Sequence, residues 1–142
     1  MPVGLPVGVV FLDDMSTVSV DCLGGGFFEG WPAPPDAATH LAHLRGAEVA
    51  VVALDPATGN AVGFATAIGD GVLTAFLPLL EVLPAWRGRG IGTALVERVL
   101  SHLAGRYSID LTCDPELIPF YARLGGTPGT AVLWRRRSVD TP

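Results

Sequence analysis

A basic, glycine-rich segment in the second half of the chain places the tightest constraint on its fold. Residues 84–92 have the sequence PAWRGRGIG, and an apolar stretch at residues 80–83 precedes them. That stretch predicts a β-strand, and the apolar spacing after Gly90 predicts a helix over residues 90–104. A glycine loop between a strand and a helix N-terminus presents backbone N–H groups and the positive end of the helix dipole. The segment therefore predicts an anion site, to which its two arginines add full positive charges.

Two well-known phosphate-binding patterns do not fit this loop. A P-loop needs a lysine after its last glycine, and all nine basic residues of the chain are arginines. A dinucleotide-binding fingerprint needs a glycine or alanine at its third glycine position, where the two available alignments place Thr93 or Leu95. These mismatches argue against both motifs, although a different kind of nucleotide-binding protein stays open as an alternative.

Composition restricts the class of protein further. The chain has 142 residues, of which 49% are hydrophobic, and a mean hydropathy of +0.45, which predicts one well-buried domain over residues 1–142. The net charge of −5 disfavours a nucleic-acid partner, and no apolar run reaches the ~18 residues that span a membrane. The N-terminus lacks the basic residues of a signal peptide, which predicts a cytoplasmic protein. Cys22 and Cys113 lack the spacing of a metal site, so no metal is expected.

Hydrophobic periodicity and turn residues predict a mixed α/β fold with six strands, mostly antiparallel, and three helices. Strands are expected at residues 7–12, 48–54, 61–68, 72–83, 107–113 and 131–135, and helices at residues 37–45, 90–104 and 117–124, with weak helical character at 14–23. The second to fourth strands should form an antiparallel meander, and the fifth should lie parallel to the fourth because a helix connects them. Asp114 should cap the last helix, and Pro119 should make its first turn irregular.

An aromatic segment follows three consecutive glycines at residues 24–26. It contains Phe27, Phe28, Glu29 and Trp31, followed by several prolines. The segment is either a loop whose aromatic side chains cover the core or a mobile wall over a substrate pocket. The second interpretation makes these four residues candidates for binding a hydrophobic or aromatic substrate.

Two histidines, His40 and His43, lie one helical turn apart in the predicted helix at residues 37–45. Their spacing would suit a pair of metal ligands, but no third ligand lies nearby in the sequence. We therefore expect both histidines on a half-exposed helix face.

The glycine-rich loop also matches a family motif. In VLPAWRGRGIG, residues 82–92, Arg87, Gly90 and Gly92 occupy the positions of the pattern Arg/Gln-x-x-Gly-x-Gly/Ala. The loop resembles the acetyl-CoA motif of the GNAT superfamily of N-acetyltransferases. Downstream, PFYARLG at residues 119–125 is similar to the C-terminal Phe-Tyr-x-x-x-Gly-Phe segment of the same family.

The resemblance extends over residues 61–134, and a helix and a strand separate the two motifs, as in the family. Two positions depart from the pattern. Asp114-Pro115 stands where the family often has asparagine, and Gly126 stands where it usually has phenylalanine. The resemblance implies a GNAT-like fold, in which a mixed, mostly antiparallel sheet of six or seven strands is flanked by about four helices. A parallel strand pair of this sheet would be splayed around the cofactor. Family members often pair through their sheets, so it also allows a homodimer.

The resemblance implies acetyl-CoA as the cosubstrate. The pyrophosphate would lie on the amides of residues 87–92, and the pantetheine arm would pair with the strand before the loop. An amide near Leu83 could also stabilise the oxyanion of the reaction. The cofactor-binding residues would be Val82, Leu83, Arg87, Gly88, Arg89, Gly90, Ile91, Gly92 and Thr93.

The implied reaction is direct acetyl transfer to a primary amine of a small molecule or peptide, through a ternary complex. An alkylamine has a pKa near ~10, so a base must remove a proton before it attacks. Glu81 is the only carboxylate in its apolar strand and is the best candidate, directly or through a water, with Glu29 and Asp36 as weaker alternatives. Tyr121 matches the position of the family's general acid. A non-catalytic acyl-CoA binding or sensing module is the alternative function.

Overall fold

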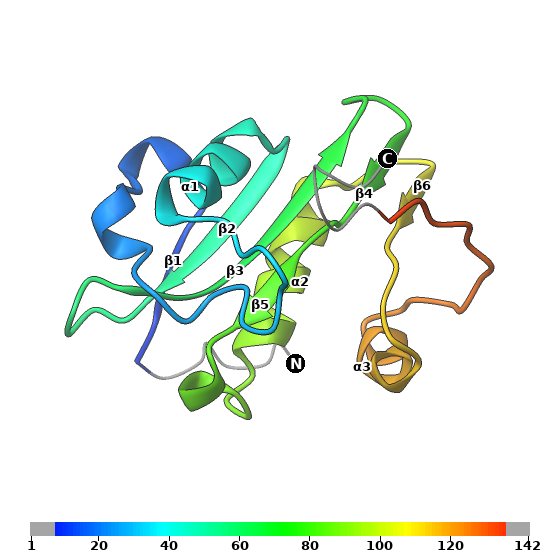
Figure 1. The fold of residues 1–142 in the computed structure, drawn as a ribbon. Helices are drawn as coiled ribbons and strands as arrows, with labels where there is room; N and C mark the ends of the chain where they lie inside the picture. Colours follow the sequence, from blue (N-terminus) through cyan, green and yellow to red (C-terminus); the bar gives the residue numbers. More distant parts are fainter. Residues whose placement is uncertain (1–7, 136–142) are drawn as a thin grey trace.

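A mixed sheet with helices on both faces forms the part of the chain that the computed structural model describes, residues 8–135 (Figure 1). The strands are β1 (Val10–Leu12), β2 (Val49–Leu54), β3 (Ala61–Gly69), β4 (Thr74–Phe76), β5 (Leu80–Val82) and β6 (Ser108–Asp110). The α-helices are α1 (Ala37–Gly46), α2 (Ile91–His102) and α3 (Ile118–Arg123). Short 3-10 turns, η1 to η4, cover Met15–Thr17, Val20–Cys22, Pro84–Trp86 and Pro115–Leu117.

The sheet has the strand order β1-β2-β3-β4-β6, with β5 also paired to β3. Neighbouring strands are antiparallel except β4 and β6, which run parallel. The expected meander and the expected parallel pair are therefore confirmed. One end of β3 pairs with β4 and its other half pairs with β5, so the single strand predicted at residues 72–83 is broken into two.

The break separates β5 from β6 and opens the sheet. Leu77 N–H donates to Asp110 C=O at 2.9 Å, just beyond the β4–β6 pairing. After this bond β5 continues along β3, while the chain after β6 leads away towards α3 (Figure 1). Within residues 8–135 no strand pairs with the outer edge of β5. The splayed parallel pair that the family resemblance implies is present.

Two apolar clusters hold the helices to opposite faces of the sheet. One face packs against α2 through buried residues that include Val51, Val62, Leu95 and Val99. The other packs against α1 and the first two 3-10 turns through residues that include Val18, Leu44, Val52 and Phe64. Each buried Val, Leu or Phe side chain contributes about 1.5–3 kcal/mol to stability. In β5, Leu80 and Val82 belong to the α2 side, so Glu81 between them faces the α1 side.

The helix ends follow local chemistry. Asp36 caps α1 by accepting from Thr39 N–H at 2.8 Å. The chain after Asp114 opens as a 3-10 turn, and α3 begins only at Ile118, which agrees with the irregular start expected from Pro119. The expected cap at Asp114 is wrong, because its side chain accepts no capping hydrogen bond within the described part of the chain.

Three further expectations differ from the structure. Residues 131–135 form no strand, and residues 14–23 form two 3-10 turns in place of a weak helix. Residues 8–135 contain three α-helices where about four were expected. The first strand begins at Val10, and residue 7 lies outside the described range. None of the helices in this range is long and apolar enough to cross a membrane.

Candidate active site

The glycine loop keeps its backbone open through two left-handed glycines. Gly88 has φ 78° and Gly90 has φ 82°, a conformation that side-chain-bearing residues rarely adopt. A side chain at either position would meet no other heavy atom of the described chain within 4 Å. Both glycines are therefore required by the path of the backbone, and the face they leave is free for a ligand.

The N-terminus of α2 leaves several backbone donors unpaired. Its first hydrogen bond runs from Ala94 N–H to Gly90 C=O at 3.1 Å, and no side chain among the described residues caps it. The N–H groups of Ile91, Gly92 and Thr93 come before that bond, at the positive end of the helix dipole. This is the geometry of an anion site.

The two arginines of the loop are exposed and contact the loop itself. Arg87 Nε donates to Val82 C=O at 3.0 Å. The Arg89 guanidinium lies 4.7 Å from the centre of the Trp86 ring and contacts Ala85 C=O at 3.4 Å. Both charges thus stay beside the N-terminus of α2.

The outer edge of β5 offers one backbone donor. Leu83 N–H donates to Val62 C=O at 2.8 Å, so it belongs to the β3 side of the strand and is not free for a cofactor or an oxyanion. This differs from the expected pairing and oxyanion role at Leu83. Because N–H groups alternate along a strand, Val82 N–H faces the open side. The prediction for Val82 remains.

Glu81 is held by one carboxylate oxygen while the other stays free. Its Oε1 accepts from Phe28 N–H at 2.9 Å. Its Oε2 is buried and has no hydrogen-bond partner among residues 8–135. Burial raises the pKa of this carboxyl, against the opposing effects of the Phe28 N–H and the Arg87 charge. A carboxylate with a raised pKa and a free oxygen is suited to accept a proton.

Tyr121 lies on α3, the helix to which the chain leads after β6 (Figure 1). Its neighbour Phe120 packs against it with ring centres 4.9 Å apart. Phe120 also approaches the loop, since a methyl group at Gly92 would lie 3.7 Å from Phe120 Cζ. Burial, and then the Cys113 thiol, raise the pKa of Tyr121 above its usual 10.0. The phenol therefore keeps its proton at neutral pH and can donate it.

Within the aromatic segment, Phe28 is buried against the core, whereas Trp31 is exposed to solvent. Phe28 is 3% exposed and packs with Phe64, so its ring is not a pocket wall and the expected substrate contact there is wrong. Its backbone instead holds Glu81, at the unusual φ of 61°. Phe27 is half-buried, and Trp31 is 46% exposed and packs edge-on against Phe28. Glu29 is exposed.

The expectation for the histidines is wrong at His40. It is 2% exposed, and its ring centre lies 4.9 Å from that of Phe28 and 4.4 Å from that of Phe64. His43 Nε2 bonds Thr66 Oγ1 at 2.9 Å. The sequence held a signal for the burial, because His40 lies four residues before Leu44 on the apolar helix face. Residues 8–135 contain no cluster of three or more residues that could hold a metal ion.

Comparison with known proteins decides the family. The sequence model of the acetyltransferase (GNAT) family matches residues 16–126. The chain belongs to this family. Among named relatives, serotonin N-acetyltransferase 2 of Oryza sativa is 39% identical over 69 residues, which cover 47% of this chain and 34% of the relative. GCN5-related N-acetyltransferase 3 of Arabidopsis thaliana is 38% identical over 76 residues, which cover 52% and 32%. This GNAT chain thus matches about a third of the length of either plant relative.

Solved structures give the same family. A candidate acetyltransferase from Deinococcus radiodurans R1 is 42% identical, with a TM-score of 0.88 over 96% of this chain and 94% of that one. An aminoglycoside N-acetyltransferase in complex with CoA is 21% identical, with a TM-score of 0.64 over 96% and 100% of the two chains, and shares the fold. The GNAT chain therefore has the fold of an acyltransferase family that uses acetyl-CoA as its acetyl donor.

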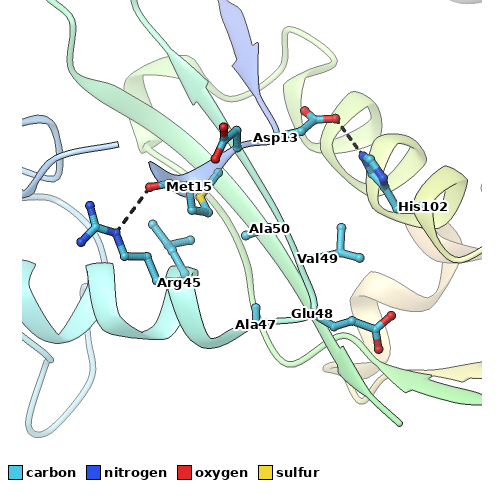
Figure 2. Close-up of a pocket in the computed structure, with 10 residues that line it drawn as sticks. Asp13, Met15, Arg45, Ala47, Glu48, Val49, Ala50 and His102 are labelled. Atoms are coloured by element: carbon cyan, nitrogen blue, oxygen red, sulfur yellow. Dashed lines mark hydrogen bonds and ion pairs between the residues drawn. The ribbon is translucent and has the colours of Figure 1, made fainter. Parts of the chain in front are cut away.

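A separate cavity of this GNAT domain lies away from the glycine loop. It measures about 220 Å³ and lies between the end of β1 and the end of α2 (Figure 2). Its wall includes His102 at the C-terminal end of α2. Because α2 has 12 residues, this end of the helix lies about 18 Å from the glycine loop at its other end. Its charged groups are occupied, because Asp13 bonds His102 at 2.8 Å and Glu48 pairs with Arg106. The cavity is therefore distinct from the glycine-loop site.

Proposed function

We propose that this chain transfers the acetyl group of acetyl-CoA directly to a primary amine of a small molecule or peptide, in a ternary complex. Glu81 acts as the general base and Tyr121 as the general acid. The observation that carries the proposal is the Glu81 carboxylate, which is fixed through Oε1 and leaves Oε2 buried and unpartnered among the described residues. A polar atom of this kind is costly unless a ligand uses it.

The cofactor fits the loop by its charge. The free N–H groups of residues 91–93 and the guanidinium groups of Arg87 and Arg89 together favour a pyrophosphate. The open N–H of Val82 favours the pantetheine arm, which can run along the outer edge of β5 as an added strand. No metal ligand is required by this arrangement.

The proton movements balance through two residues of this chain. The acceptor enters as an ammonium ion and gives a proton to Glu81 Oε2, which leaves a neutral amine. The new N–C bond forms as the C–S bond breaks, and the departing sulfur takes a proton from the Tyr121 hydroxyl. The acylated nitrogen then gives up its extra proton, which restores the Tyr121 hydroxyl and leaves a neutral amide. Glu81 releases the proton that it took from the ammonium ion to water, so both residues return to their starting states. Glu81 is suited to its role because burial raises its pKa towards that of the amine. Tyr121 is protonated at neutral pH, so its hydroxyl is available as a donor to the departing sulfur.

The acceptor is expected to be a cationic amine that carries an apolar or aromatic group. The half-exposed ring of Trp31 packs on Phe28, whose N–H holds Glu81, so an aromatic surface lies near a buried carboxylate. Such a pair favours an ammonium group attached to an apolar body. The names of related proteins include serotonin and glucosamine 6-phosphate acetyltransferases, and those acceptors are theirs.

Two predictions about the setting remain proposals. We place the chain in the cytoplasm, although the named rice and Arabidopsis relatives are chloroplastic. Pairing of two copies through their sheets is proposed only by analogy with the family.

The test combines acetyl-CoA with a panel of primary amines and measures the release of free thiol. Glu81→Gln should lower kcat by about 10²–10⁴, the usual loss for a missing general base. Glu97→Gln, at an exposed glutamate of α2, serves as the matched control and should leave the rate unchanged. If no amine is acetylated while acetyl-CoA raises the melting temperature, the chain is an acyl-CoA binding module.

A further inference from the structure

Two buried polar side-chain atoms have no hydrogen-bond partner in residues 8–135, and both belong to residues beside one aromatic cluster. This cluster consists of the rings of Phe27, Phe28 and Phe64. The two atoms are His40 Nε2 and Glu81 Oε2. His40 comes from α1 and Glu81 from β5, so the two meet only through tertiary packing. Buried polar atoms are nearly always hydrogen-bonded in native proteins, and each exception calls for a ligand or a function.

Phe28 and Phe64 connect His40 to Glu81, because each of them neighbours both residues. Glu81 lies directly opposite Phe64 in the β3–β5 register, which places their side chains on one face, about 4.5–5.5 Å apart at Cβ. The His40 ring packs on the same Phe64 ring at 4.4 Å. Phe28 contacts His40 with its ring at 4.9 Å and holds Glu81 Oε1 with its N–H at 2.9 Å.

An imidazole at position 40 lowers the stability of the fold, because it buries an unpaired nitrogen. Phenylalanine would fill the space among the rings of Phe27, Phe28 and Phe64 without burying an unpaired nitrogen. Phe28 is also the only residue other than glycine with a positive φ in residues 8–135. Stability given up next to a catalytic group is typical of a functional site.

We propose that His40 has two roles beside Glu81: it positions the Glu81 carboxylate and it contributes to binding the acceptor. Its ring holds Phe28 in the strained conformation that aims the N–H at Oε1, and its Nε2 shares with Oε2 the polar group that enters with the acceptor amine. The proposal rests on the proposed function, because it takes Glu81 as the proton acceptor. It assigns to α1 a part in acceptor recognition that lies outside both family motifs.

The charge state of His40 suits this role. Burial, and then the nearby His43, lower the pKa of His40 to about 4, so the imidazole is neutral at neutral pH. A neutral ring can hydrogen-bond an ammonium group or water without repelling it. The other titratable groups around this cluster are His43 on α1, Arg87 after β5 and Glu29 in the aromatic segment, whereas β3 contributes none.

The test compares His40→Phe, which keeps a ring but removes Nε2, with His40→Gln, whose amide can restore a polar atom. His40→Phe should have an equal or higher melting temperature, yet lower kcat/KM for the amine by about tenfold, as for one lost hydrogen bond to a charged group. The KM for acetyl-CoA should not change. His40→Gln should recover part of the activity.

His43→Phe is the matched control, since His43 lies one turn along the same helix and also packs near Phe64. It leaves Thr66 Oγ1 unpaired, so it should lower the melting temperature while kcat/KM per folded molecule stays unchanged. Wild-type kcat/KM for the amine in His40→Phe would overturn the proposal. Should that variant fail to fold, an inactive and folded His40→Gln would overturn it instead. Unchanged activity in Glu81→Gln would instead refute the proposed function.

Discussion

The proposed cofactor side and the proposed acceptor side of this molecule are built in different ways. The cofactor side consists of consecutive residues, 87–93, that use backbone N–H groups at one helix end. The acceptor side is assembled from three separate elements that contribute Phe28, His40 and Glu81, and these meet only by packing on the α1 face. The first is a local property of a short sequence, whereas the second exists only in the folded chain. Changes on one side should therefore leave binding on the other side intact.

The largest effect is expected at Tyr121, the proposed general acid. Tyr121→Phe keeps the ring packing against Phe120 and removes only the hydroxyl, so kcat should fall by about 10²–10⁴ with little change in either KM. Tyr107→Phe, at a tyrosine that is 88% exposed, is the control in the same thiol-release assay. An unchanged kcat would remove Tyr121 from the reaction.

A change in the loop should affect only the cofactor. Gly90→Ala forces a side chain into a left-handed conformation, which costs about 1–2 kcal/mol and should raise the KM for acetyl-CoA about tenfold. Gly105→Ala is the matched control, because Gly105 has φ 89° and equally open surroundings at the far end of α2. It should lose similar stability and keep its affinity. A raised KM for the amine in Gly90→Ala would show that the two sides do not bind their ligands independently.

The pH dependence should report on the acceptor side alone. Glu81 must be ionised to accept a proton, and burial raises its pKa from 4.5, so kcat/KM for the amine should fall as pH decreases through a midpoint above 4.5. A pH series of initial rates measures this midpoint. Binding of CoA, followed by melting temperature, should stay level over the same range. A midpoint at or below 4.5 would show that Glu81 is not the titrating base.

The smallest effect is expected at Trp31. Trp31→Ala removes an exposed aromatic face, which should raise the KM of an aromatic amine by a factor of about 2–10, the usual size of a contact between two aromatic rings. An aliphatic amine of equal charge should be less affected. Trp134→Ala, at a tryptophan that is 81% exposed, provides the control. Equal losses for both amines would argue against stacking.

The sequence predicted those parts that depend on neighbouring residues. The glycine loop, the start of α2, the meander and the irregular opening at Pro119 all follow from local spacing and backbone preferences. The resemblance to the GNAT family, confirmed by the match over residues 16–126, rests on the same local motifs. Backbone chemistry of this kind is visible in a short stretch of sequence.

Other features depend on contacts between distant residues. Residues 72–83 look like one strand, but β3 is shared between β4 and β5, and this sharing interrupts the strand after Phe76. The burial of His40 depends on Phe28, which reaches it from a loop that periodicity does not describe. An amide near Leu83 was expected to face the cofactor, but the register with β3 turns the Leu83 N–H towards Val62 C=O.

The contact between Phe28 and Glu81 places two unrelated demands on one residue. The carboxylate is held by a main-chain N–H, so among the natural side chains only proline at position 28 would delete the donor. The Phe28 ring has a separate role, because it fills the space beside His40. It does so although the backbone has a φ of 61°, which glycine or asparagine adopts more easily than phenylalanine. Substitutions at this position can thus alter the packing of the cluster while leaving the anchor of the carboxylate in the backbone.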